Sequence, residues 1–204
     1  GGAYSACTSP QSYTGLADGS HTFTVRATDG AGNTDASPAT YTWTVDTVAP
    51  ETSITAQPAN PTNSTSASFS FVSNEAGPFQ CQLDGLGFSG CASPKSYPGP
   101  LSQGSHTFQV KATDGAGNTD ATPASFPWTV DTTPPETTIN SGPPSLSNSS
   151  SASFAFVSNE AGSAFQCQLD GGGFAPCTSP KSYTALANGS HTFQVRATDP
   201  AGNV

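Results

Sequence analysis

Short stretches in which apolar and polar residues alternate run through the whole chain. In residues 105–113, His106, Phe108, Val110 and Ala112 alternate with threonine, glutamine and lysine. One face of such a strand is apolar and the other is polar, which is the pattern of a half-buried β-strand. No stretch shows the three- to four-residue apolar spacing of an amphipathic helix. The pattern therefore predicts an all-β protein.

Between residues 47 and 131 the alternation and the turn residues predict seven short strands. Asp84-Gly85 suits a tight hairpin turn, because both residues tolerate positive φ. Seven short strands separated by turns favour an antiparallel β-sandwich. The expected strands cover residues 52–55, 66–72, 79–83, 88–91, 95–97, 105–113 and 124–130. The expected core comprises Phe69, Phe71, Phe79, Leu83, Phe108, Val110, Trp128 and Val130, with Phe154, Phe156, Phe165, Leu169, Phe193 and Val195 as the later equivalents.

The same sequence block recurs at a fixed distance. His21, His106 and His191 are 85 residues apart (106 − 21 and 191 − 106) within repeated Gly-Ser-His-Thr-Phe segments. A constant period indicates tandem copies of one structural unit. We expect residues 1–46 to be the C-terminal part of a repeat, residues 47–131 a complete repeat, and residues 132–204 a repeat that lacks its last strand. The expected arrangement is a rod of sandwiches, and these 204 residues are expected to be part of a longer array of repeats.

The five cysteines recur at corresponding positions of the repeats, 84 to 86 residues apart (91 − 7, 167 − 81 and 177 − 91). Two of them lie on the arms of each Asp-Gly hairpin, ten residues apart, which predicts the disulfides Cys81–Cys91 and Cys167–Cys177. Cys7 occupies the position of Cys91 and Cys177, so its partner is expected just before Gly1. A zinc site needs four ligands, whereas each repeat offers two cysteines and one histidine. Each disulfide would stabilise its repeat by about 2–3 kcal/mol and indicates an extracellular or periplasmic location.

The charge composition excludes several classes of function. The chain has only five Lys and Arg residues and a net charge of −9, so neither nucleic acid nor an anionic membrane surface is an expected partner. No apolar run is long enough for a membrane span, so no membrane insertion is expected. The three histidines belong to different repeats and cannot form one site. Because no catalytic triad or carboxylate pair can be assembled within a repeat, we expect no enzyme activity.

Acidic and amide residues gather near the ends of the repeats and are candidate calcium ligands, since calcium prefers six to eight oxygen atoms. An acidic loop and an acidic linker together could bind calcium and stiffen the joint between domains. The alternative interpretation is that Asp-Gly and Gly-Asn simply form turns and Asp131 ends a strand. No other cofactor is expected. The candidate ligands are Asp29, Asn33, Asp35, Asp46, Glu51, Asp114, Asn118, Asp120, Asp131 and Glu136.

Two motifs carry a family resemblance. The block from Leu186 to Asp199 with the following Ala-Gly-Asn, and the linker from Trp128 to Pro135, resemble the tandem immunoglobulin-like (Ig-like) repeats of large bacterial surface and secreted proteins. The resemblance implies an Ig or fibronectin type III sandwich used as an adhesin stalk, spacer or filament. Some relatives bind calcium at their junctions.

The expected function is therefore structural: the repeat region of an extracellular or cell-surface fibre, stalk or filament. The alternatives are an adhesin module that binds carbohydrate or protein through its loops, and a subunit of a self-assembling filament. The expected partners are the neighbouring repeats, and beyond them other copies of the chain or a ligand on a host or cell surface.

Overall fold

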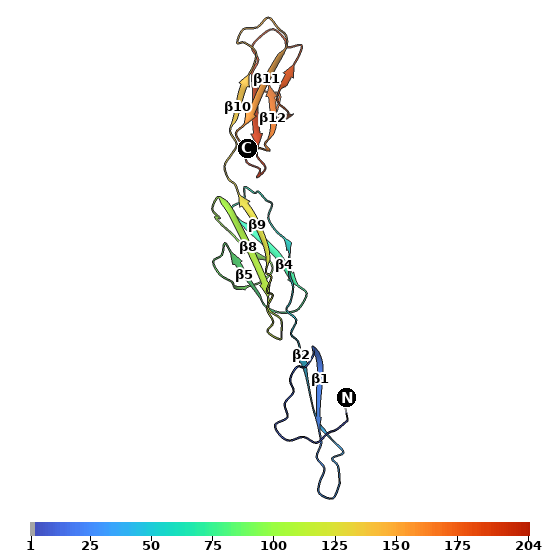
Figure 1. Cartoon of the computed structure of the whole chain (residues 1–204). Helices are drawn as coiled ribbons and strands as arrows, with labels where there is room; N and C mark the ends of the chain where they lie inside the picture. The colour runs from blue at the N-terminus through green and yellow to red at the C-terminus, as the bar shows by residue number, and fades with distance from the viewer. Residues whose placement is uncertain (1–2) are drawn as a thin grey trace.

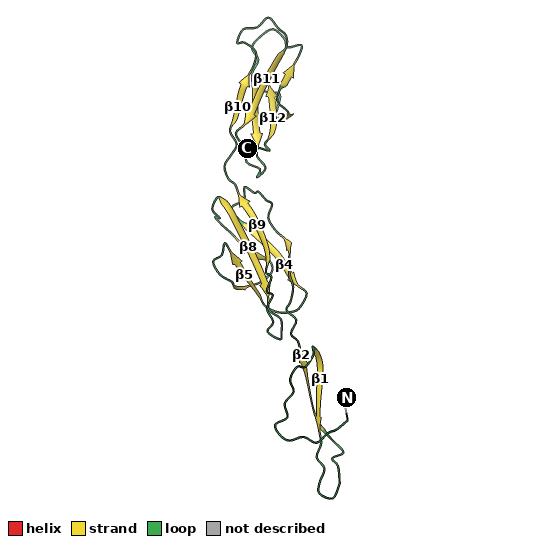
Figure 2. Cartoon of the chain, in the orientation of Figure 1, coloured by secondary structure: helices red, strands yellow, loops and turns green. Residues whose placement is uncertain are grey.

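The computed structural model describes residues 3–204, which form fifteen β-strands and no helix (Figure 2). The strands fall into three groups that follow one another along the chain (Figure 1). None of the described segments is a helix that could span a membrane.

The middle unit contains seven strands in two antiparallel sheets. One sheet has the order β3-β4-β7 and the other the order β6-β5-β8-β9. Side chains from both sheets share one core, so the unit is a β-sandwich. Its strands are β3 (Thr52–Ala56), β4 (Ala67–Ser73), β5 (Phe79–Leu83), β6 (Ser89–Cys91), β7 (Lys95–Tyr97), β8 (Gly104–Ala112) and β9 (Ala124–Val130).

Aromatic residues fill the core of this sandwich as the alternation predicts. The ring of Phe69 on β4 stacks on Phe108 of β8 at 4.1 Å between centroids and meets the edge of Trp128 at 5.2 Å. Six of the eight expected core residues are fully buried, while Phe79 and Leu83 are half-buried against the same cluster. Phe79 and Leu83 lie at the two ends of β5, where fewer side chains cover them.

The third unit repeats this architecture with sheets β10-β11-β14 and β13-β12-β15. Phe154 stacks on Phe193 at 4.1 Å, as Phe69 does on Phe108. Of the equivalent core residues, however, only Phe156 is fully buried. The counterpart of β9 would lie after residue 204, so these side chains have fewer neighbours among the described residues than their equivalents in the middle unit. The strands are β10 (Thr137–Ser141), β11 (Ala152–Ser158), β12 (Ala164–Leu169), β13 (Ala175–Cys177), β14 (Lys181–Tyr183) and β15 (Phe193–Thr198).

The first unit contains one antiparallel pair, β1 (Gly19–Val25) and β2 (Ala39–Val45). Disulfides join Cys81 to Cys91 and Cys167 to Cys177, each across the two strands of a hairpin, as the cysteine spacing predicts. Cys7 is exposed and has no disulfide partner among residues 3–204. The expected partner before Gly1 lies outside the described residues and stays a prediction.

Candidate functional site

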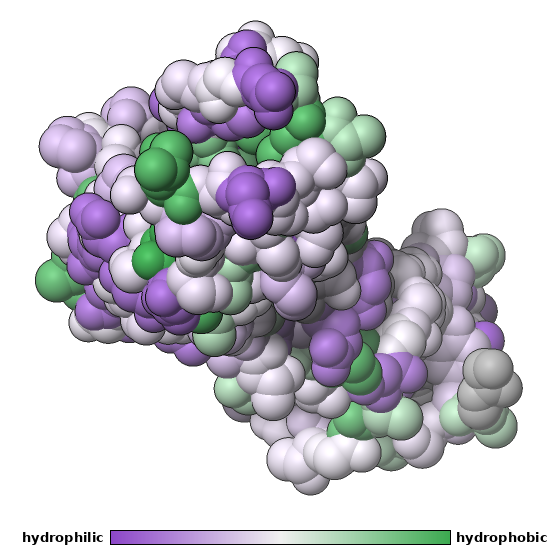
Figure 3. All heavy atoms as spheres, turned by 90° about the horizontal axis from the view of Figure 1, so that it is seen from above, coloured by the Kyte–Doolittle hydropathy of each residue, from purple (hydrophilic) through white to green (hydrophobic). Residues whose placement is uncertain are grey.

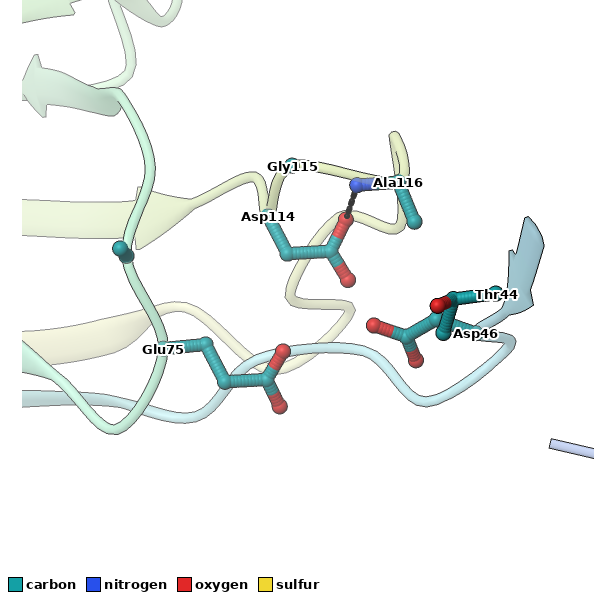
Figure 4. A pocket seen from close by; sticks show the side chains of 7 residues that line it. Thr44, Asp46, Glu75, Asp114, Gly115 and Ala116 are labelled. Atoms are coloured by element: carbon teal, nitrogen blue, oxygen red, sulfur yellow. Dashed lines mark hydrogen bonds between the residues drawn. The ribbon is translucent and has the colours of Figure 1, made fainter. Parts of the chain in front are cut away.

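Three carboxylates meet at each of the two boundaries between units. Asp46, Glu75 and Asp114 form the first acidic cluster, and Asp131, Glu160 and Asp199 form the second. Within each cluster, one oxygen atom from each residue lies within 4.8 Å of the others. In Figure 4 the side chains of Asp46, Glu75 and Asp114 point towards a common space. Corresponding residues are 85 apart (131 − 46, 160 − 75 and 199 − 114), so the two sites are copies.

Strand ends bring these three residues together. Asp46 follows β2 and belongs to the linker, whereas Glu75 follows β4 and Asp114 follows β8 of the next unit. Since β4 and β8 belong to different sheets of the sandwich, their ends meet only at the end of the domain. The cluster therefore joins a linker to the two sheets of the repeat that follows it.

Asp114 also organises its own loop. Its Oδ1 accepts hydrogen bonds from the backbone N–H groups of Ala116, Gly117 and Asn118 at 2.7–2.9 Å, and its Oδ2 accepts one from the Asn118 side chain at 2.8 Å. Burial alone would raise the pKa of Asp114, but these donors outweigh burial and hold that pKa below its ordinary value. The carboxylate is therefore charged at neutral pH and fixed in position.

The second cluster has the same construction. Asp199 accepts hydrogen bonds from the backbone of Gly202 and Asn203 and from the Asn203 side chain, and these bonds lower its pKa against the effect of burial. Burial raises the pKa of Glu160, and the negative charges of Asp131 and Asp199 raise it further. Three acidic groups thus crowd together. A hard divalent cation would relieve this repulsion, and carboxylate oxygens are the donors that calcium prefers.

No basic side chain neutralises these clusters. All five Lys and Arg residues of the chain lie over aromatic rings, with 4.0–5.3 Å between the cation and the ring centroid. Within residues 3–204 the only ion pairs are between a histidine and an aspartate. The five pairs of a cation and an aromatic ring are Arg26–Tyr4, Lys95–Tyr97, Lys111–Phe88, Lys181–Tyr183 and Arg196–Phe174.

The linkers themselves are held by hydrogen bonds that repeat at both boundaries. The side-chain amide of Asn118 donates to the carbonyl oxygen of Asp46 at 3.0 Å, and that of Asn203 donates to Asp131 at 2.8 Å. Each bond connects a loop of one unit to the linker that enters it.

Further side chains hold the linker residues on either side. Asn74 and Asn159 accept hydrogen bonds from the backbone N–H groups of Glu51 and Glu136 at 2.7 and 2.8 Å. In the preceding units, Asp18 accepts two hydrogen bonds from Thr47 of the first linker. Gln103 accepts two hydrogen bonds from Thr132 of the second linker. The side-chain amide of Gln103 also donates to Thr133 and Asp131. Each linker is thus held by hydrogen bonds from both the preceding and the following unit.

The structure brings together some of the expected calcium ligands and separates others. Asp46 and Asp114 share the first cluster, and Asp131 belongs to the second. Asp120 instead accepts bonds from the backbone N–H groups of Thr52 and Thr122. Asn118 lies beside the first cluster, where its amide donates to Asp114 and Asp46.

The remaining candidates lie elsewhere. Glu51 and Glu136 lie in the linkers but belong to neither cluster. Asp29, Asn33 and Asp35 form the corresponding turn of the first unit, where Asp29 accepts bonds from Asn33 and Asp35 from Ser37. Calcium binding by any of these residues stays a prediction.

Glu75, Glu160 and Asp199 were missing from the expected ligands. One signal in the sequence could have found the two glutamates: Asn-Glu-Ala-Gly recurs at residues 74–77 and 159–162, although the residues after it differ. Asp199 is the 85-residue counterpart of Asp114 and follows from the repeat alone.

Sequence comparison agrees with the sandwich architecture. Residues 7–47 and residues 86–130 each match a family model described as a bacterial Ig-like domain. The chain carries tandem bacterial Ig-like repeats. The second match lies within the seven-stranded repeat and covers β8 and β9, while the first covers their counterparts β1 and β2. No curated protein matches the Ig-like chain significantly.

Several solved structures are similar to this Ig-like chain. A bacterial ice-binding adhesin of 1.5 MDa is 16% identical over 92% of this chain and 71% of that one, with a TM-score of 0.40. A Ca2+-stabilised adhesin of an Antarctic bacterium is 19% identical over 90% of this chain and 54% of that one, with a TM-score of 0.33. A tetra-tandem repeat of a large adhesion protein is 20% identical over 92% of this chain and 55% of that one, with a TM-score of 0.33. The chain thus spans about half the length of the last two. With TM-scores below 0.5, these similarities carry no conclusion about its function.

Proposed function

We propose that this chain is a mechanical spacer: a run of Ig-like repeats in an adhesion-associated stalk or fibre outside the cell. The single observation that carries the proposal is the linker contact made twice, from Asn118 to Asp46 and from Asn203 to Asp131. Together with the bonds that Asp18 and Gln103 of the preceding repeats make to the same linkers, this contact would limit rotation between neighbouring repeats. An array with such restricted joints would extend as a rod.

The composition and the disulfides support an extracellular setting. Disulfides persist where the surroundings are oxidising, and each complete hairpin has one. The surface in Figure 3 is mostly pale, with small separate groups of purple and green residues, as expected for a chain rich in Ser, Thr and Gly. Such a surface stays hydrated without many charges and offers no broad apolar area on this face.

Small-angle X-ray scattering of the chain tests the rod. A compact protein of this length has a radius of gyration of about 17 Å, and the rod predicts a clearly larger value. Replacing the linker contacts by Asn118→Ala and Asn203→Ala should lower the radius of gyration, because the repeats then rotate about the linker. Asn33→Ala is the matched control, since Asn33 occupies the same position in the first unit. A compact wild-type particle would contradict the stalk.

Calcium is the second part of the proposal. Asp46, Glu75 and Asp114 would hold one ion, and Asp131, Glu160 and Asp199 another. The ion would supply positive charge and link the linker carboxylate to the repeat that follows. Support comes from the crowding of three carboxylates that no Lys or Arg neutralises.

Calorimetric titration tests both calcium sites. We expect two calcium ions to bind the wild-type chain, one to bind Glu75→Gln or Glu160→Gln, and none to bind the double variant. Glu51→Gln is the matched control, because Glu51 lies in the first linker but outside the cluster. Equal binding by the wild type and the double variant would rule out the two clusters as calcium sites.

A further inference from the structure

One position in each unit lies directly before the repeated Gly-Ser-His segment. Asp18, Gln103 and Asn188 occupy it, 85 residues apart (103 − 18 and 188 − 103). In the first two units the side chain at this position binds the linker that follows. Asp18 accepts hydrogen bonds from Thr47 at 3.0 and 2.8 Å, and Gln103 accepts them from Thr132 at 3.4 and 2.8 Å. The residue at this position therefore decides which groups a unit offers to its linker.

Asn188 is followed by Gly189, and this is the single Asn-Gly pair of the sequence. The side-chain carbonyl carbon of an asparagine lies within reach of the backbone nitrogen of the next residue, and a bond between the two closes a five-membered ring. Glycine favours this attack, because it has no side chain to hinder it and its backbone adopts many conformations. The other nine asparagines are followed by serine, threonine, glutamate, proline or valine.

The backbone around Gly189 is free of the constraints that hold the equivalent glycines. Gly19 and Gly104 are the first residues of β1 and β8, where they pair with β2 and β9. Gly189 lies outside any strand, because β15 begins only at Phe193. Both Asn188 and Gly189 are exposed, and nothing lies within 4 Å of the Cβ position of Gly189. The chain thus has room to bend into the ring.

We propose that Asn188 is a site of spontaneous covalent modification, at which the asparagine is converted to aspartate and isoaspartate. The Gly189 nitrogen bonds to Cγ of Asn188, the Gly189 N–H gives up its proton, and the side-chain nitrogen leaves as ammonia. Water then opens the cyclic imide at either of its two carbonyl groups. One opening restores the original backbone, and the other leaves the backbone running through Cγ. The reaction consumes one water molecule, releases one ammonia molecule and needs no enzyme, cofactor or oxidant.

The conversion changes what the third unit can offer at its linker-binding position. A carboxamide both donates and accepts hydrogen bonds, as Gln103 does when it donates to Thr133 and Asp131. A carboxylate only accepts, as Asp18 does from Thr47. The modification therefore replaces the amide type of the second unit by the carboxylate type of the first. It adds one negative charge and proceeds in one direction, so this position records the age of the molecule.

Peptide mapping of the intact 204-residue chain tests the site. After incubation at neutral and mildly alkaline pH, trypsin releases the peptide Ser182–Arg196, in which Asn188 is the only asparagine. The exchange of NH2 for OH is followed by mass, and isoaspartate is detected by a methyltransferase specific for it. Because a serine side chain hinders the attack, we expect conversion at Asn188 about tenfold or more faster than at Asn63 and Asn148, both exposed and followed by serine. The rate should rise with pH, since the attacking nitrogen must lose its proton.

Two variants and the undigested starting material supply the controls. Asn188→Gln should abolish conversion in this peptide, because the longer side chain would have to close a less favourable six-membered ring. Gln103→Asn creates the same dipeptide in the middle unit, where Gly104 is paired within β8. Conversion at position 103 should be about tenfold or more slower than at Asn188, because the ladder must open before the ring can close. A sample digested without incubation gives the background.

Two outcomes would overturn the proposal. If Asn188 stays unchanged while a synthetic peptide of residues 182–196 is converted under the same conditions, the folded chain protects the site. If position 103 of Gln103→Asn is converted as fast as Asn188, the dipeptide alone sets the rate and the structure assigns no particular site. Neither result bears on the stalk, which scattering tests separately, and a compact particle in scattering would leave the chemistry of Asn188 unaffected.

Discussion

Nδ1 of His106 lies 2.7 Å from Oδ2 of Asp84, and Nε2 of the same ring lies 2.8 Å from the carbonyl oxygen of Ser102. Both partners are acceptors, so both ring nitrogens must carry a proton for the two bonds to form. The hydrogen bond to Ser102 raises the pKa of His106; burial opposes it, and Asp84 adds to it. This buried imidazolium ties the hairpin turn to β8.

The histidines make the stability of the repeats depend on pH. A pKa raised above the usual 6.5 contributes stability that is present below that value and is lost as the pH rises through the raised pKa. We therefore expect the melting temperature to fall as the pH rises above about 6.5 and through the raised pKa of His106, and to fall less in His106→Gln. An equal fall in the variant would contradict the role of His106.

In the third unit, an aspartate makes the stability of the repeat depend on pH in the acidic range as well. The hydrogen bond from His191 lowers the pKa of Asp170, and the same bond raises the pKa of His191. The stability from Asp170 is present above the ordinary aspartate value and is lost as the pH falls through the lowered one. Asp170→Asn should flatten the acid limb of a calorimetric melting curve series. An unchanged acid limb would mean that other carboxylates cause it.

Removing a hairpin disulfide should destabilise the complete repeat. Cys81 and Cys91 close a loop of ten residues, which is worth about 2.5–3 kcal/mol in the chain-entropy account. We expect the double variant Cys81→Ala/Cys91→Ala to lose about this much in urea unfolding. As a control, a reducing agent should destabilise the wild type but should not destabilise this repeat further in the variant. A larger loss would point to packing around the buried Cys81.

Gly77 cannot be replaced without moving the backbone. A Cβ atom at this position would lie 1.8 Å from the carbonyl oxygen of Thr113. Gly77→Ala should therefore destabilise the repeat by about 2–4 kcal/mol, measured by urea unfolding. Gly90→Ala is the matched control, because nothing lies within 4 Å of its Cβ position and its φ is not in the left-handed region. It should change the stability by less than about 1 kcal/mol.

The core should respond most strongly at Phe108, which is fully buried and stacks on Phe69. Phe108→Ala should cost about 3–5 kcal/mol in urea unfolding, since it removes a ring from the centre of the sandwich. Val72→Ala on β4, whose side chain is exposed, should cost much less. Similar losses in the two variants would mean that the aromatic stack is not the centre of the core.

The strands could be predicted from the sequence because alternation is a local property. Residues 79–83, 95–97 and 124–130 were placed with the observed bounds. The hairpin disulfides were equally local. The acidic clusters were not: Asp46 and Asp114 were both among the candidate ligands, but nothing in the sequence placed them in one site, and Glu75 was missed. Which loops share one end of a sandwich depends on the order of strands in the two sheets, and alternation does not specify that order.

The pairing of every Lys and Arg with an aromatic ring has a consequence for crowded arrangements of this chain. Each cation is held over a ring of its own repeat, and acidic residues outnumber basic ones by 14 to 5, so copies lying side by side meet through surfaces of excess negative charge. At physiological salt this repulsion acts over about 8 Å. Parallel copies should therefore stay separate at low ionic strength and approach one another only when salt or divalent cations screen their acidic groups.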